Sequence, residues 1–143
     1  MQVAIHEAEQ GLEKNGLPID SVLANSKDHI VDRGHNRRVQ DNDPTAHAEI
    51  VYIRNAGCRR DWTNLTLVST LSPCIMCTGT ALLYKIPRIV IGENRNFQGA
   101  EDLFHARRVE LIHLDNPRCI ELMKYFIADN PDLWNQDIGE PSD

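Results

Sequence analysis

Residues 65–92, LTLVSTLSPCIMCTGTALLYKIPRIVIG, decide the fold class of this chain. Apolar and β-branched residues over 65–70 and again over 88–92 predict two strands, and residues 73–84 between them predict a helix. Two strands joined by a helix run parallel in one sheet, because a parallel pair needs a long crossover. This stretch therefore predicts a strand, helix, strand unit of the α/β class.

The same alternation continues on both sides of this unit. The polar stretch 34–44 predicts an exposed loop, after which Asp43 is expected to cap a helix that has Pro44 at its first position. The other predicted elements are helices over 1–12, 44–56, 101–108 and 118–128 and strands over 21–24, 29–31 and 109–114. Five strands among these helices predict a three-layer α/β/α fold with a central mixed, mostly parallel five-stranded sheet.

Composition places the chain among single soluble domains. Its 143 residues are 41% hydrophobic and 25% charged, which predicts one domain over 1–143. The formal net charge of −6 argues against a nucleic-acid partner, since such partners are bound by neutralising phosphates. We expect no membrane segment and a cytoplasmic location, because no apolar run is long enough to span a bilayer. The apolar end, 129–143, is expected to fold back onto the domain.

Two short motifs carry ligands for a metal. They are His47-Ala48-Glu49 and Pro73-Cys74-Ile75-Met76-Cys77, each expected near the start of a helix. Cys74 and Cys77 are three residues apart, so both sulfur atoms can face one point. The positive end of a helix lowers a thiol pKa, and the thiolate is the form that binds metal. With His47 they predict a three-ligand zinc site whose fourth position stays open to water, as in catalytic sites.

Glu49 is placed to act as the acid and base of this site. It lies two residues from the ligand His47, so its carboxylate can reach water near the metal without being a ligand. A His-x-Glu motif followed by Pro-Cys-x-x-Cys is the general signature of zinc nucleobase deaminases. Two other interpretations stay open: a redox pair for Cys74 and Cys77, and a non-catalytic zinc module with four protein ligands.

Over nearly its whole length the chain resembles the fungal-type zinc-dependent cytosine deaminases of the cytidine deaminase-like superfamily. The matching segments are 16–19, 33–36, 70–74, 76–79, 86–88, 92–94, 96–97 and 137–140. The resemblance implies a homodimer that binds one zinc ion per chain and deaminates a free nucleobase in pyrimidine salvage. It also implies that 129–143 closes over the active site.

The same resemblance assigns substrate contacts by position. Asn36 is similar to the amide that reads the pyrimidine edge, and Asp137 to the carboxylate that accepts the N1 hydrogen of a free base. At Ala48 the resemblance implies a substrate contact through the backbone NH. At Ser72 it implies a contact through the backbone carbonyl, with the side chain left uncommitted. The pocket walls implied by the resemblance are Ile19, Leu71, Phe97 and Trp134.

The reaction implied is hydrolysis of cytosine to uracil and ammonia. Hydroxide generated at zinc would attack C4 while Glu49 moves protons to N3 and the leaving amine. A nucleoside carries ribose on N1, so Asp137 would favour cytosine over cytidine. Deamination of guanine, isocytosine or adenosine in tRNA stays open as an alternative.

Overall fold

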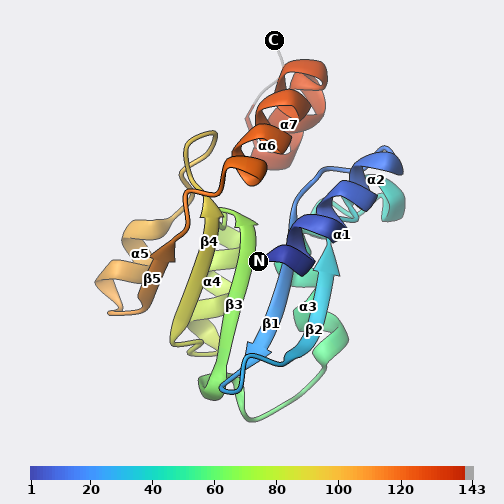
Figure 1. The fold of residues 1–143 in the computed structure, drawn as a ribbon. Helices are drawn as coiled ribbons and strands as arrows, with labels where there is room; N and C mark the ends of the chain where they lie inside the picture. Colours follow the sequence, from blue (N-terminus) through green and yellow to red (C-terminus); the bar gives the residue numbers. More distant parts are fainter. Residues whose placement is uncertain (141–143) are drawn as a thin grey trace.

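The computed structural model describes residues 1–140 and contains one five-stranded sheet in the order β2-β1-β3-β4-β5 (Figure 1). The strands are β1 (Asp20–Asn25), β2 (Ile30–His35), β3 (Leu65–Leu71), β4 (Arg88–Glu93) and β5 (Glu110–His113). β1 is antiparallel to both neighbours, whereas β3, β4 and β5 are parallel. Four of the five strands thus run in one direction, which confirms the mixed, mostly parallel sheet.

Helices cover both faces of this sheet. α1 (Gln2–Glu13) and α6 (Pro117–Asp129) lie on one face, and α3 (Ala48–Ala56), α4 (Ile75–Leu83) and α5 (Glu101–Ala106) lie on the other (Figure 1). Strand residues alternate accordingly: Val22 and Val68 pack with α1, while Leu23 and Leu67 join the core under α3, α4 and α5. The three-layer α/β/α prediction is confirmed.

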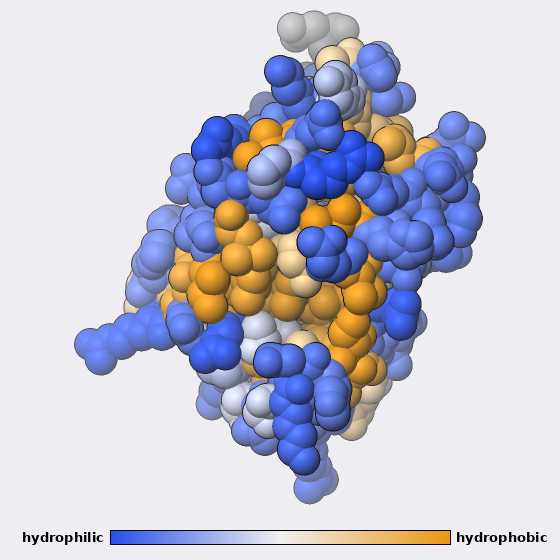
Figure 2. Space-filling view, in the orientation of Figure 1, coloured by the Kyte–Doolittle hydropathy of each residue, from blue (hydrophilic) through white to orange (hydrophobic). Residues whose placement is uncertain are grey.

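The layer formed by α1 and α6 leaves part of its face of the sheet uncovered (Figure 2). Figure 2 shows hydrophobic surface over the strands, below the two helices. Met1 and Val90 belong to the small cluster on this face and are only partly buried. The larger core lies on the other face and contains the fully buried Tyr52 and Phe104.

The chain before α3 differs from the prediction. The loop over 34–44 contains a short helix, α2 (Arg38–Asp41), and α3 begins at Ala48 rather than at Pro44. Asp43 caps no helix, because its carboxylate accepts hydrogen bonds from the backbone N and the hydroxyl of Thr45 within a turn. His47 occupies the N-cap position of α3 instead. This shift moves the motif His47-Ala48-Glu49 to the very start of the helix.

A close approach of β2 and α3 sets the position of that helix start. Gly34 lies against the backbone of α3, where a Cβ atom would come within 2.1 Å of the carbonyl oxygen of Ala48. Only glycine therefore allows this contact. Gly34 thereby determines how near the motif around Ala48 lies to the sheet.

The end of the chain forms a helix that composition alone did not indicate. α7 (Pro131–Ile138) follows α6 and ends at Gly139, which adopts a left-handed conformation. Residues 141–143 of the predicted tail lie outside the described residues. A short 3₁₀ helix, η1 (Trp62–Asn64), precedes β3. Within residues 1–140, no helix combines the length and apolar composition that crossing a bilayer requires.

Candidate active site

Three metal donors converge where α3 and α4 begin. His47 is the N-cap of α3, Cys74 is the N-cap of α4, and Cys77 lies in the first turn of α4. Their donor atoms lie within 4.8 Å of one another, and they form the only such group among residues 1–140. Nδ1 of His47 lies 3.5 Å from Sγ of Cys74. One imidazole and two thiols in this arrangement fit zinc.

Burial and mutual contacts shift the pKa values of the three donors in different directions. The hydrogen bond from Cys77, together with His47, lowers the pKa of Cys74 to about 4, while hydrogen bonding to Cys74 and burial raise that of Cys77 well above its usual range. Burial alone would lower the pKa of His47, but Cys74 and Asp137 raise it to about 9. A lowered pKa favours the thiolate form of Cys74, which is the form that binds zinc. Zinc would displace the remaining protons on binding.

Glu49 lies in the first turn of α3, directed into the same site. It is 3% exposed, and its Oε1 accepts a hydrogen bond of 2.8 Å from the hydroxyl of Ser69 on β3. Burial raises the pKa of this carboxyl group. A buried carboxyl group with a raised pKa can both accept and donate a proton near neutral pH.

Asn36 and Asp137 meet although 101 residues separate them. Nδ2 of Asn36 donates a 3.0 Å hydrogen bond to Oδ1 of Asp137, and Oδ1 of Asn36 accepts from the backbone N of Arg38 at 3.1 Å. Oδ1 of Asp137 also lies 3.7 Å from Nε2 of His47, a charge contact too long for a hydrogen bond. α7 thus places a carboxylate beside the metal donors.

These groups line a small, partly open pocket with a free volume of about 20 Å³, room for little more than one water molecule. Phe97 and Trp134, which both line this pocket, pack edge to face with ring centroids 5.6 Å apart. Of the predicted site residues, the pocket wall includes Ile19, His47, Glu49, Leu71, Ser72, Cys74, Phe97, Trp134 and Asp137. A heterocycle can enter only if part of this wall moves.

The remaining predicted residues lie just outside the wall. Cys77 belongs to the metal donor group, and Asn36 reaches the pocket through its hydrogen bond to Asp137. Ala48 is fully buried between His47 and Glu49 in the first turn of α3. All twelve predicted site residues therefore lie at one end of the sheet.

The expectation that the Ser72 side chain is uncommitted is wrong. Its hydroxyl donates a 2.7 Å hydrogen bond to Oε1 of Glu101 and accepts one of 3.0 Å from the backbone N of Gly99. Glu101 is 3% exposed and also contacts Nε2 of His113 at 2.8 Å. These bonds fix the loop that carries Phe97. No local pattern indicates this role, because the partners come together only in the folded chain.

Fold and donor set together define a zinc-dependent deaminase domain. A family model described as the cytidine and deoxycytidylate deaminase zinc-binding region matches residues 1–93, and the chain belongs to this family. Over 142 aligned residues it is 42% identical to the cytosine deaminase of Candida albicans. The aligned region covers 98% of this chain and 95% of that protein. The predicted resemblance to fungal cytosine deaminases is thereby confirmed.

Enzymes that act on tRNA are also similar to this chain. A tRNA-specific adenosine deaminase of Streptococcus pyogenes is 39% identical over 108 residues, which cover 73% of this chain and 67% of that protein. A structure from studies of A-to-I editing by tRNA:A34 deaminases superposes with a TM-score of 0.74 at 29% identity, covering 85% of this chain and 96% of that chain. The chain is therefore a deaminase, a hydrolase that acts on carbon–nitrogen bonds of cyclic amidines, and its cofactor is zinc.

Proposed function

We propose that this enzyme hydrolyses free cytosine to uracil and ammonia. The observation that carries the proposal is the carboxylate of Asp137, which lies beside Asn36 and His47 and lines the pocket. A free base can donate its N1 hydrogen to this carboxylate, whereas a nucleoside has a sugar on N1 and would clash. The full-length similarity to a cytosine deaminase supports the same substrate.

His47, Cys74 and Cys77 would hold the zinc ion. When bound there, zinc supplies a Lewis acid that makes water a competent nucleophile near neutral pH. The chain itself supplies the proton transfers. Glu49 accepts a proton from the water that adds to C4 and delivers it to N3. It then takes the remaining proton from the C4 hydroxyl group and passes it to the exocyclic amine, which leaves as ammonia while C4 becomes a carbonyl. Ser69 orients Glu49 through the 2.8 Å hydrogen bond to Oε1.

Asn36 and Asp137 read the edge of the base remote from the reacting carbon. The amide of Asn36 offers a donor to the ring carbonyl, and the carboxylate of Asp137 accepts the N1 hydrogen. The backbone NH of Ala48 and the backbone carbonyl of Ser72 add further contacts to the base. The ring itself packs against the apolar walls, which are Ile19, Leu71, Phe97 and Trp134.

Closure by α7 excludes water during the reaction. Trp134, Asp137 and Ile138 of this helix all line the pocket. A free volume of about 20 Å³ is far smaller than a pyrimidine, so α7 or the loop carrying Phe97 must open for entry. In this proposal the chain is one domain, and its C-terminal segment from residue 129 is the lid.

The cellular setting is proposed from the family resemblance. We place the enzyme in the cytoplasm, in pyrimidine salvage, as a homodimer without a nucleic-acid partner. The net charge of −6 supports the last point. Sedimentation analysis should give twice the chain mass of 16.2 kDa, and a monomer at micromolar concentration would refute the dimer.

A substrate panel tests the proposed reaction. Ammonia release by the zinc-loaded protein is measured with cytosine, cytidine, isocytosine, guanine and adenosine. The expected result is release from cytosine, with cytidine at least about 100-fold slower because it lacks the N1 hydrogen. Equal rates on cytosine and cytidine would refute the role given to Asp137. A preference for guanine would make guanine, rather than cytosine, the substrate.

Adenosine in tRNA is the second candidate substrate, because a tRNA-specific adenosine deaminase of S. pyogenes is 39% identical over 108 residues. Such a substrate requires a basic surface, which a chain with 21 acidic and 15 basic residues is poorly suited to provide. A gel-shift with tRNA at about 0.15 M salt separates the two candidates. Tight binding there, with inosine formation, would favour tRNA over the free base.

A further inference from the structure

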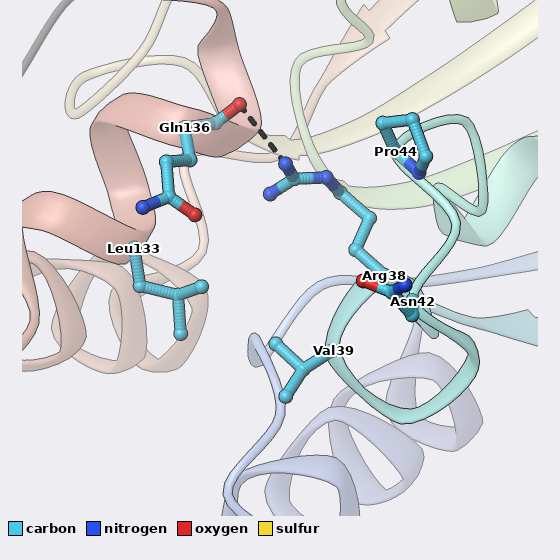
Figure 3. A pocket seen from close by; sticks show the side chains of 6 residues that line it. All are labelled: Arg38, Val39, Asn42, Pro44, Leu133 and Gln136. Atoms are coloured by element: carbon cyan, nitrogen blue, oxygen red, sulfur yellow. Dashed lines mark hydrogen bonds between the residues drawn. The ribbon is translucent and has the colours of Figure 1, made fainter.

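Arg38 of α2 connects the active site to the C-terminal helix. Its side chain is only 12% exposed, and Nη1 lies 3.3 Å from Oδ1 of Asp137 while Nη2 donates a 3.1 Å hydrogen bond to the carbonyl oxygen of Gln136. Figure 3 shows the guanidinium group extending from α2 to the backbone of Gln136 on α7. Arg38 and Gln136 both line an open pocket of about 310 Å³. The side chain of Arg38 thus holds Gln136 and Asp137, which lie 98 and 99 residues further along the chain.

The contacts of Asp137 are divided unequally between its two oxygen atoms. Asn36, Arg38 and His47 all approach Oδ1. No hydrogen bond from the described part of the chain reaches Oδ2 of Asp137. The carboxylate is therefore anchored on one side and keeps an acceptor on the other, in a pocket that Asp137 lines.

We infer that Arg38 is a positioning residue that determines selectivity for free bases. By holding Oδ1 of Asp137 and the adjacent Gln136 carbonyl, Arg38 orients Oδ2 to accept the N1 hydrogen of the substrate. This inference rests on the proposed function, since it concerns the contact that separates cytosine from N1-substituted bases. A planar guanidinium group can bond Oδ1 of Asp137 and the carbonyl oxygen of Gln136 at once. The single ammonium group of lysine does this less well.

The neighbouring Arg37 provides a matched control. Its side chain is 47% exposed and pairs with Asp41 one turn along α2, at 2.7 Å, without contact to α7. Substitution at either position removes one positive charge from the same short helix. Only the substitution at Arg38 removes the contact with Asp137.

The experiment compares Arg38→Met, Arg38→Lys and Arg37→Met with the unmodified zinc-loaded protein. Cytosine and 1-methylcytosine, which has no N1 hydrogen, are tested as substrates or competitive inhibitors. Arg38→Met is expected to raise KM for cytosine about 10- to 100-fold, with a much smaller change for 1-methylcytosine, because only cytosine uses the oriented carboxylate. Arg38→Lys restores part of the loss, and Arg37→Met stays within about twofold of the unmodified enzyme.

Two further measurements separate positioning from general damage. In an Asp137→Asn background, Arg38→Met should change KM much less than it does in the unmodified protein, because the contact with the carboxylate is already lost and only the bond to the Gln136 carbonyl remains. Amide hydrogen exchange over residues 131–138 should be faster in Arg38→Met than in Arg37→Met. The inference is overturned if Arg38→Met affects cytosine and 1-methylcytosine equally, or if exchange in α7 is unchanged. An unmodified protein inactive on cytosine would refute the proposed function, while the exchange comparison would still decide whether Arg38 holds α7.

Discussion

The buried carboxyl group of Asp20 should make the stability of this enzyme fall as pH rises. Asp20 is 1% exposed at the start of β1, and Nδ1 of His35, the residue opposite it on β2, lies 2.5 Å from its Oδ1. Burial raises the pKa of Asp20 from 3.8 to about 6, although His35 acts in the opposite direction. Glu7 of α1 is a further charge beside the pair, 3.3 Å from Nε2 of His35.

The size of the effect follows from the two pKa values of Asp20. The folded protein holds the proton up to about pH 6, whereas the unfolded chain releases it near 3.8. The stabilisation is therefore complete below pH 3.8 and is lost as pH rises through 6. A difference of about two pKa units corresponds to ~3 kcal/mol in the free energy of unfolding. His35 adds to this trend, because its contact with Asp20 raises its pKa above the ordinary 6.5 and the resulting stability is lost as pH rises above that value.

Asp20→Asn tests this reasoning, since asparagine has a similar shape and no titration. The free energy of unfolding is measured by urea denaturation at pH 4 and pH 7 for both proteins. Loss of zinc at acid pH affects both proteins and cancels in the difference. The stability of Asp20→Asn relative to the unmodified protein should rise by ~3 kcal/mol between the two pH values. A difference that is constant with pH would refute the assignment of this titration to Asp20.

Three further predictions concern the site itself. Asp137→Asn should raise KM for cytosine about 10- to 100-fold and reduce the preference over cytidine, measured by ammonia release, because the charged acceptor is lost; unchanged selectivity would contradict it. Cys77→Ala should lower bound zinc from one per chain to nearly none, measured by elemental analysis, whereas Cys119→Ala, outside the donor group, should retain it. Trp134→Ala should reduce the free energy of unfolding by ~3 kcal/mol in urea, because a side chain that is 6% exposed loses its packing; a loss below ~1 kcal/mol would place Trp134 outside the core.

The parts of the fold that depend on local sequence patterns could be predicted from sequence. Alternating strands and helices from residue 65 onward follow from hydrophobic periodicity, and the metal donors follow from the spacing of Cys74 and Cys77 and from the motif around His47. Each of these signals is contained within a few consecutive residues, where periodicity and helix-capping rules apply.

The parts that depend on distant contacts could not be predicted in this way. The helix expected from Pro44 begins at Ala48 because Asp43 bonds Thr45 within a turn instead of capping the helix. Arg38 looks like one of two arginines in a polar loop, and only the fold brings it to Asp137. The bond from Ser72 to Glu101 likewise joins residues 29 apart. The family resemblance indicated Asp137, but hydrophobic periodicity does not reveal which residues hold its carboxylate in place.

Glu49→Gln, assayed on cytosine at equal zinc content, tests the central claim most directly, because it removes the proton carrier and leaves the three donors in place. Glu121→Gln serves as the control, since its side chain is 47% exposed on α6. We predict that Glu49→Gln binds one zinc ion per chain yet releases ammonia at least about 100-fold more slowly, while Glu121→Gln matches the unmodified enzyme. Release by zinc-loaded Glu49→Gln within about tenfold of the unmodified rate would contradict the account.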